Sequence, residues 1–246
     1  RDRLDPVDGV ALLQWPGEDL SLDGVTHILS SIAPGATGDP ILMAMRDRIA
    51  SAPDLQWVGY LSTTAVYGDR GGDWVDETSD LVPASPRGQW RVDAEQAWQT
   101  VEGLPLHIFR LAGIYGPGRG PFSKLKSGKL RRIIKQDQVF SRIHVEDIAQ
   151  VLMASIARPN PGAVYNVCDD EPAPPQDVIG YAAELQGLPL PEAVAFEDAD
   201  MTPMARSFYS ENKRVRNDRI KDELGVQLMY PDYRAGLNAL VAADSI

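Results

Sequence analysis

Residues 60–68 read Tyr-Leu-Ser-Thr-Thr-Ala-Val-Tyr-Gly, an apolar run that ends in hydroxyl side chains and a glycine. A short apolar run that stops at a turn residue is typical of a strand buried on both faces. A polar loop rich in glycine and proline follows it. Ser85-Pro86 then precedes Arg87, which predicts a helix start because serine is a common N-cap and proline suits the first helical turn. The stretch therefore predicts a strand, a long loop and a helix, in that order.

Strand and helix signals alternate along most of the chain. Asp39 and Pro40 predict the start of a helix that runs through residue 50, and Ile41, Leu42, Met45 and Ile49 fall at helical spacing within it. Further helices are expected at 87–101 and from 141–148 onward to residue 157. Strands are expected at the short apolar runs 10–13, 26–33, 55–61, 106–111 and 163–167. This alternation predicts an α/β fold with a doubly wound, mostly parallel sheet and helices on both faces.

The composition changes after Gly116, which follows the strand expected at 106–111. A loop of glycine and proline at 116–121 precedes the basic run 124–135, for which we expect a solvated helix. The prediction is a sheet domain and a smaller C-terminal lobe. The sheet domain would take residues 1–115 and 141–168, and the lobe would take 116–140 and 169–235.

Composition and charge narrow the possible functions. The 246-residue chain has a net charge of −11, which argues against nucleic-acid partners and anionic membrane surfaces because both need clustered lysine and arginine. No apolar run reaches the length that spans a bilayer. Cys168 is the single cysteine, which excludes an intramolecular disulfide and fits a reducing cytoplasm, the location we expect. The histidines at 27, 107 and 144 lack metal-ligand spacing, so we expect no metal site.

Five segments resemble, in order, the motifs of the extended short-chain dehydrogenase/reductases, and more narrowly of their atypical bacterial members. They are 61–68, 110–118, 142–149, 165–171 and 212–225, and they include Ile114-Tyr115-Gly116-Pro117-Gly118 and Ile143-His144-Val145-Glu146-Asp147. The resemblance implies a Rossmann fold that binds NAD or NADP. It implies epimerase, dehydratase or reductase chemistry on a nucleotide sugar or a similar small polar substrate. It also makes a homodimer possible, with the helix at 87–101 as one candidate contact.

The chain departs from that family in two respects. The family's catalytic Tyr and Lys positions hold Arg87 and Arg91. A guanidinium stays protonated, so Arg87 cannot exchange a proton as the family's Tyr does. The family's Gly-rich phosphate-binding turn is also missing, because the glycines at 116–120 follow a late strand. If 10–13 is the third strand of the sheet, we expect a strand, loop, helix and strand to precede Arg1.

The two arginines lie four residues apart on one helix face, and Glu95 continues that face. One interpretation is a surface charge ladder in which Glu95 pairs with Arg91. The other is a pair of cations, with Arg87 holding an anionic substrate group and Arg91 holding cofactor ribose.

The resemblance also assigns other site residues. Thr63 stands at the catalytic Ser/Thr position, or is only a strand-end threonine with a local hydrogen bond. Tyr67 is either a packed turn residue or a substitute proton donor. Arg1 would lie where a basic residue can receive the 2′-phosphate of NADP, unless it is only a frayed terminus. The remaining residues expected to contact the cofactor lie at the carboxyl ends of strands, and they are Ser31, Ile32, Ala33, Ser62, Leu111, Gly113 and Ile114.

Several other residues have structural interpretations. Asp76 and Glu77 match a loop acid that either touches substrate or caps a turn, and His144 and Asp147 are expected to fix the start of a helix. We expect the late apolar residues to be core rather than cavity lining, namely Met201, Met204, Phe208 and Tyr209. Two functions remain open: an NAD(P)-dependent enzyme of the epimerase/dehydratase type, and a non-catalytic dinucleotide-binding sensor or interaction module.

Overall fold

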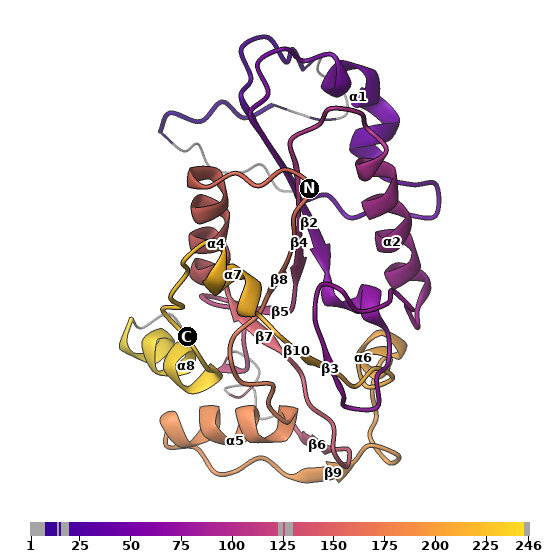
Figure 1. The fold of residues 1–246 in the computed structure, drawn as a ribbon. Coiled ribbons are helices and arrows are strands. Elements are labelled where there is room, and N and C mark those ends of the chain that lie inside the picture. Colours follow the sequence, from indigo (N-terminus) through magenta and orange to yellow (C-terminus); the bar gives the residue numbers. More distant parts are fainter. Residues whose placement is uncertain (1–7, 14, 16–19, 123–124, 126–129, 244–246) are drawn as a thin grey trace.

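The computed structural model describes residues 8–13, 15, 20–122, 125 and 130–243. At its centre lies a four-stranded parallel sheet in the order β1-β2-β4-β8 (Figure 1). In the register of the central pair, Ser62 lies opposite Arg110 and Thr63 lies opposite Leu111, so both strands end at the same edge. The strands are β1 (His27–Ser30), β2 (Trp57–Thr63), β4 (Leu106–Leu111) and β8 (Val164–Val167).

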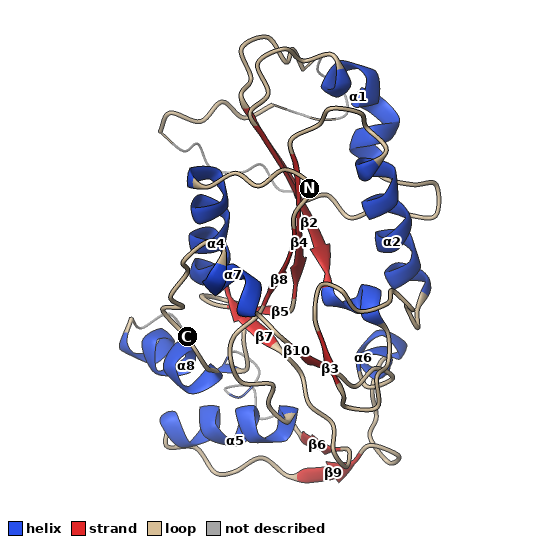
Figure 2. Cartoon of the chain, in the orientation of Figure 1, coloured by secondary structure: helices blue, strands red, loops and turns tan. Residues whose placement is uncertain are grey.

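Helices cover both faces of the sheet (Figure 2). On one face lie α1 (Pro40–Ala50) and α2 (Pro86–Gln99), and on the other lie α4 (Val145–Ala157) and α7 (Asp218–Asp222). Because side chains alternate along a strand, Ile108 packs toward α1 and α2 while the neighbouring Phe109 packs toward α4. The predicted doubly wound α/β fold is confirmed.

The chain beyond the sheet forms a smaller assembly with its own core (Figure 1). A short parallel pair joins β6 (Arg132–Ile134) to β9 (Ala193–Ala195), and the helices are α5 (Pro175–Leu185), α6 (Pro203–Phe208) and α8 (Tyr233–Ala242). Val178 and Ala182 of α5 are buried with Leu237 and Leu240 of α8.

Short elements connect this lobe to the sheet. β5 (Gly113–Tyr115) continues from β4 and pairs with β7 (Arg142–His144). β3 (Trp74–Val75) pairs with β10 (Arg214–Val215), and the 3-10 helix η1 (Thr64–Tyr67) follows β2 directly. Both pairs bring late parts of the chain beside the carboxyl edge of the sheet.

Two sequence predictions about the fold are wrong. The run 10–13 is not a strand, and its residues Val10, Leu12 and Leu13 are 53%, 46% and 56% exposed, because no other described segment pairs with it. Within the basic run, residues 132–134 form the strand β6 rather than a helix. Residues 124 and 126–129 lie outside the described residues.

Among the described residues, no helix is long and apolar enough to cross a membrane. The same residues contain no group of three or more His, Cys, Asp or Glu side chains placed to hold a metal ion.

Candidate active site

A cavity of about 710 Å³ lies at the carboxyl edge of the sheet. This is where parallel α/β sheets bind ligands, and the volume is in the usual range for a small-molecule site. One wall comes from the ends of β1, β2 and β4, a second from the start of α2, and a third from residues 207–215 of the lobe. The lining includes polar, charged and aromatic residues and glycine, namely Ser31, Thr63, Arg87, Arg91, Gly113, Arg119, Phe208, Glu211 and Lys213.

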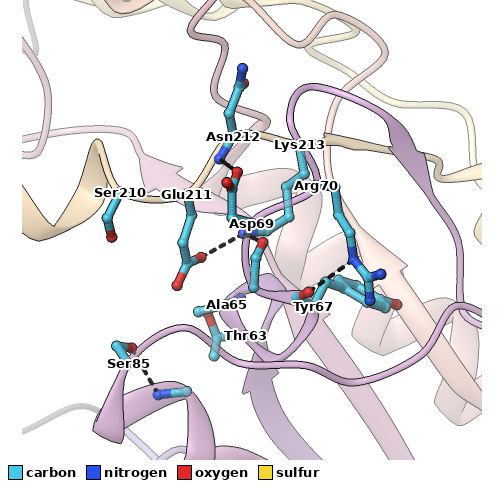
Figure 3. Close-up of polar contacts among 12 residues, drawn as sticks. Thr63, Ala65, Tyr67, Asp69, Arg70, Ser85, Ser210, Glu211, Asn212 and Lys213 are labelled. Atoms are coloured by element: carbon cyan, nitrogen blue, oxygen red, sulfur yellow. Dashed lines mark hydrogen bonds and ion pairs between the residues drawn. The ribbon is translucent and has the colours of Figure 1, made fainter.

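Thr63 is the last residue of β2 and lies where the strand leads into a turn (Figure 3). Its hydroxyl oxygen accepts a hydrogen bond from the backbone N–H of Ala65 at 3.2 Å and so caps η1. The turn closes at Gly68, which has a φ of 68° and where a Cβ would come within 1.9 Å of the Val82 carbonyl oxygen. Glycine is therefore required here, and the turn holds Thr63 in the cavity wall.

Tyr67 points away from the cavity, and its proposed role as proton donor is wrong for this geometry. The side chain is 0% exposed and absent from the cavity lining. Its hydroxyl donates to Asn166 Oδ1 at 2.7 Å and accepts from Arg110 Nη1 at 2.9 Å. Burial raises the pKa of Tyr67 to about 12, against the opposing effect of Arg110. The packed-residue interpretation of Tyr67 is the one that fits.

The start of α2 brings both arginines to the cavity. Ser85 caps the helix by accepting from the Gly88 N–H at 3.2 Å (Figure 3). Arg87 is exposed and lines the cavity, and its side chain has no hydrogen bond or ion pair with any residue that the structure describes. Arg91 donates from Nη1 to the Leu61 carbonyl oxygen at 2.5 Å. Arg91 is thus anchored to the strand, while Arg87 is available to a ligand.

Glu95 does not pair with Arg91, contrary to the charge-ladder interpretation. It is 1% exposed and faces the sheet, where its Oε2 lies 2.7 Å from Arg110 Nη2. Ser62 also donates its hydroxyl proton to the Glu95 carboxylate. Ser62 lines the cavity, but its hydroxyl group is turned toward this buried ion pair.

The other residues expected at the cofactor divide into two groups. Ser31, Ala33, Leu111, Gly113 and Ile114 all line the cavity. A Cβ on Gly113 would lie 3.3 Å from the Ser141 carbonyl oxygen, so the glycine keeps this wall close to β7. Ile32 is 38% exposed and does not line the cavity, and Arg1 lies outside the described residues.

The loop acids and the helix start have structural roles. The Asp76 carboxylate accepts from the Thr78 N–H at 2.9 Å, and the Glu77 carboxylate accepts from the Asn166 N–H at 2.7 Å. Neither lines the cavity. His144 is the N-cap of α4, and Asp147 accepts from the Met229 N–H at 2.7 Å, as expected for residues that fix this helix.

Sequence reasoning missed the wall that the lobe contributes. Lys213 lines the cavity, and its ammonium group donates to the Gly68 carbonyl oxygen at 2.8 Å and to Glu211 Oε2 at 2.5 Å (Figure 3). Phe208 also lines the cavity and is 62% exposed, so its assignment to the core is wrong. Met204 is 52% exposed, whereas Tyr209 is buried as expected. Lys213 lies inside the motif at 212–225, but that motif indicated only a helix.

No model of a known protein family matches the chain. Protein YeeZ of Escherichia coli (strain K12) is 28% identical over 217 residues, which cover 87% of this chain and 73% of YeeZ. The dTDP-glucose 4,6-dehydratase of Salmonella typhimurium is 24% identical over 187 residues. That match covers 68% of this chain and 52% of the enzyme, so the chain spans about half of the enzyme's length.

The chain is also similar to solved structures, one of them at a much higher sequence identity. A conserved protein of unknown function from Silicibacter pomeroyi has 74% identity and a TM-score of 0.92, over 94% of this chain and 82% of that one. An epimerase/dehydratase-type protein from Methylobacillus flagellatus has 28% identity and a TM-score of 0.62, over 83% and 70% of the two chains. The dTDP-glucose 4,6-dehydratase of Bacillus anthracis, solved with NAD, has 20% identity and a TM-score of 0.70, over 89% and 72%, and shares the fold.

These matches agree with the family resemblance of the five motifs. The structural neighbours are epimerase/dehydratase-type proteins, and the chain resembles an atypical short-chain dehydrogenase/reductase. Thr63 lies in the cavity wall together with Arg87 and Arg91.

The cavity is cationic although the whole chain carries a net charge of −11. Arg87, Arg91, Arg119 and Lys213 line it, and Glu211 is the one carboxylate among the described lining residues. That carboxylate already pairs with Lys213. A concave site with a surplus of one charge attracts ligands of the opposite charge, so this cavity favours anions.

A second cavity of about 750 Å³ lies in the lobe beside α5 and α8. Its described lining is mostly leucine and proline, with Arg131 and Glu192 at its border. It lacks the converging polar groups that orient a substrate, so the cavity at the sheet edge is the candidate active site.

Proposed function

We propose that this protein binds NAD or NADP at the carboxyl edge of its sheet and acts on a nucleotide sugar or a similar small polar substrate. The single observation that carries the proposal is the cationic cavity in which Thr63, Arg91 and Gly113 meet at that edge. Related proteins support the same class, since the similar protein from Bacillus anthracis was solved with NAD.

The residues present fit the nicotinamide half of such a cofactor. Leu111, Gly113 and Ile114 line the part of the cavity where the ring would lie. Arg91 uses Nη1 to bind Leu61 and Tyr60. Its other guanidinium nitrogens have no hydrogen-bond partner among the described residues and remain as donors for ribose hydroxyls. A bound nicotinamide would supply hydride transfer.

The other residues of the wall would bind and orient the substrate. Thr63 would hold a substrate oxygen through its hydroxyl group, and Arg87 would hold an anionic group of the substrate, because its side chain has no partner among the described residues. Neither arginine can accept a proton at neutral pH. The group that moves the substrate proton is therefore not the residue at the family's Tyr position.

Titration of the full-length protein with NADPH and then with NADH, followed by nicotinamide fluorescence, tests the proposal. Saturable binding in the micromolar range supports it and gives the cofactor preference. If the full-length protein binds neither nucleotide, the oxidoreductase proposal has to be abandoned.

The loss of the Tyr and Lys favours a second candidate, a dinucleotide-binding sensor or interaction module without catalysis. Measured turnover distinguishes the enzyme from the non-catalytic binding module. If the parent shows no turnover with bound cofactor and Arg87→Tyr with Arg91→Lys gains it, the parent is a binder. If the parent already turns over and Thr63→Ala abolishes turnover, the sensor hypothesis is wrong.

A further inference from the structure

Tyr60 of β2 is a buried tyrosine that contacts the cavity wall from behind. Its side chain is 0% exposed, and it is absent from the described lining of the cavity, whereas the next residue along the strand, Leu61, lines the cavity. Tyr60 therefore cannot touch a ligand at the sheet edge. Any part that it takes in ligand binding has to act through a neighbouring side chain.

The ring of Tyr60 is fixed by the helix that covers it. Arg91 and Trp98 are seven residues apart on α2, so both project from the same face of the helix. The Trp98 side chain is 0% exposed, and its ring centroid lies 5.9 Å from that of Tyr60. Leu42 and Met45 of α1 belong to the same core cluster as these two rings. Close packing on these sides holds the Tyr60 hydroxyl group in one place.

Tyr60 contacts the Arg91 guanidinium in two ways. Its hydroxyl oxygen accepts a hydrogen bond from Arg91 Nη1 at 3.1 Å, and Arg91 Cζ lies 5.7 Å from the centroid of its ring, within cation–π range. The same Nη1 donates to the Leu61 carbonyl oxygen at 2.5 Å. Burial raises the pKa of Tyr60 to about 12, against the opposing effect of Arg91. The hydroxyl group is therefore neutral at physiological pH.

An arginine can be anchored at one nitrogen and still present others in a fixed direction, because its guanidinium is a rigid plane. Arg91 Nε and Nη2 have no hydrogen-bond partner among the described residues, and Arg91 lines the cavity. A lysine would carry all its protons on one atom at the end of a flexible stem. Anchoring that atom to Tyr60 and Leu61 would leave one proton for a ligand. The buried tyrosine and the arginine thus suit each other.

We propose that Tyr60 is a positioning residue for cofactor binding. It holds Arg91 at Nη1, so that the remaining guanidinium nitrogens meet the hydroxyl groups of the cofactor ribose. The inference rests on the proposed function for the ligand. It adds to that function a residue outside the cavity on which the affinity for the cofactor depends.

The test measures NADH binding by nicotinamide fluorescence in the full-length protein and its variants. Tyr60→Phe keeps the ring and removes the acceptor for Arg91, so it should weaken NADH binding by about threefold or more. In a protein that already carries Arg91→Ala, Tyr60→Phe should cause no further loss, because the two residues act as one unit. If Tyr60 merely supported the shape of β2, its replacement would weaken NADH binding in both backgrounds.

Tyr165→Phe is the matched control. Tyr165 is also a strand tyrosine with 0% exposure, and its hydroxyl donates to Glu223 Oε2 at 3.1 Å, but it lies on β8 and does not line the cavity. Its replacement removes a buried hydroxyl group and should leave NADH affinity unchanged. Urea unfolding of both tyrosine variants shows whether a loss of NADH affinity merely follows a loss of stability.

A second measurement needs no ligand. The guanidinium Nε–H signal of Arg91 in NMR spectra, assigned by its absence from Arg91→Ala, should shift or broaden in Tyr60→Phe and stay in place in Tyr165→Phe. The inference is overturned if Tyr60→Phe leaves this signal or the NADH affinity as in the parent, or if the loss persists in the Arg91→Ala background. If the parent binds no NADH, the proposed function falls with the inference. If the parent binds NADH and Tyr60→Phe binds it equally well, only the inference falls.

Discussion

Arg110 of β4 and Glu95 of α2 form an ion pair behind the cavity wall, with Arg110 Nη2 2.7 Å from Glu95 Oε2 and side chains 5% and 2% exposed. The pair ties the helix that carries Arg87 and Arg91 to the central strand. Arg110 Nη1 also donates to the Tyr67 hydroxyl, so the same contact fixes the turn after Thr63. The geometry of the cavity thus depends on an ion pair whose two residues do not themselves line the cavity.

Replacing Glu95 with Gln should destabilise the fold strongly. Removal of one partner leaves a buried, uncompensated guanidinium, which typically costs about 3–5 kcal/mol. Urea unfolding followed by tryptophan fluorescence measures the change. Glu171→Gln is the control, because its pair with Arg234 is 39% and 45% exposed and such surface pairs contribute about 0–1 kcal/mol. Equal losses in the two variants would contradict the importance of the buried pair.

Local signals in the sequence were sufficient for much of the fold. The helix at 40–50 begins behind Asp39 and contains the expected buried Leu42, Met45 and Ile49, and the strand at 106–111 has the predicted bounds. An N-cap, a first-turn proline and apolar spacing act within a few residues, so they are visible in the sequence. The run 10–13 has the same apolar signal as a strand. A strand also needs a neighbour to pair with, and composition does not reveal one.

The site was less accessible to sequence reasoning, because its contacts join distant residues. Lys213 binds Gly68 across 145 positions of the sequence, and the Tyr67 hydroxyl binds Asn166 across 99. The orientation of Tyr67 and the place of Lys213 therefore follow from tertiary packing. Arg91 and Thr63 were found because they occupy motif positions, which fix their place in the fold.

Replacing Arg91 with Ala should weaken NADH binding by about tenfold, because a charge-assisted hydrogen bond contributes about 1.5–3 kcal/mol. Arg91→Lys keeps a donor and should lose less. Nicotinamide fluorescence measures both affinities. Gln96→Ala serves as the control, since Gln96 is exposed on α2 and does not line the cavity. An Arg91→Ala protein with parental NADH affinity would show that Arg91 only anchors α2 to β2.

Asp169 should make the stability of the protein depend on pH. It is 1% exposed, and burial raises its pKa to about 8 although Arg142 opposes the shift. The unfolded chain releases this proton near pH 4, whereas the folded protein keeps it to about pH 8. The folded state binds more protons across that window, so this contribution to stability is lost as the pH rises from about 4 to 8.

The variant Asp169→Asn isolates the effect, since the amide cannot ionise. Urea unfolding at several pH values should give a stability difference, variant minus parent, that becomes more positive between pH 4 and pH 8. Other titrating groups contribute to both proteins and cancel in this difference. A difference that stays constant or becomes more negative would mean that Asp169 is ionised in the folded protein.

Replacing Phe208 with Ala should affect ligand binding but not stability. The ring is 62% exposed at the edge of the cavity, so its removal should change the free energy of unfolding by less than about 0.5 kcal/mol. Stacking of a base on an aromatic ring contributes about 1–3 kcal/mol, and dTDP-glucose should therefore bind about tenfold more weakly. Calorimetry measures this affinity, and inorganic pyrophosphate, which has no ring, should bind as it does to the parent. Met153→Ala is the matched control, because Met153 is 65% exposed on α4 and away from the cavity. If Phe208→Ala binds dTDP-glucose as tightly as the parent, the ring does not contact the ligand.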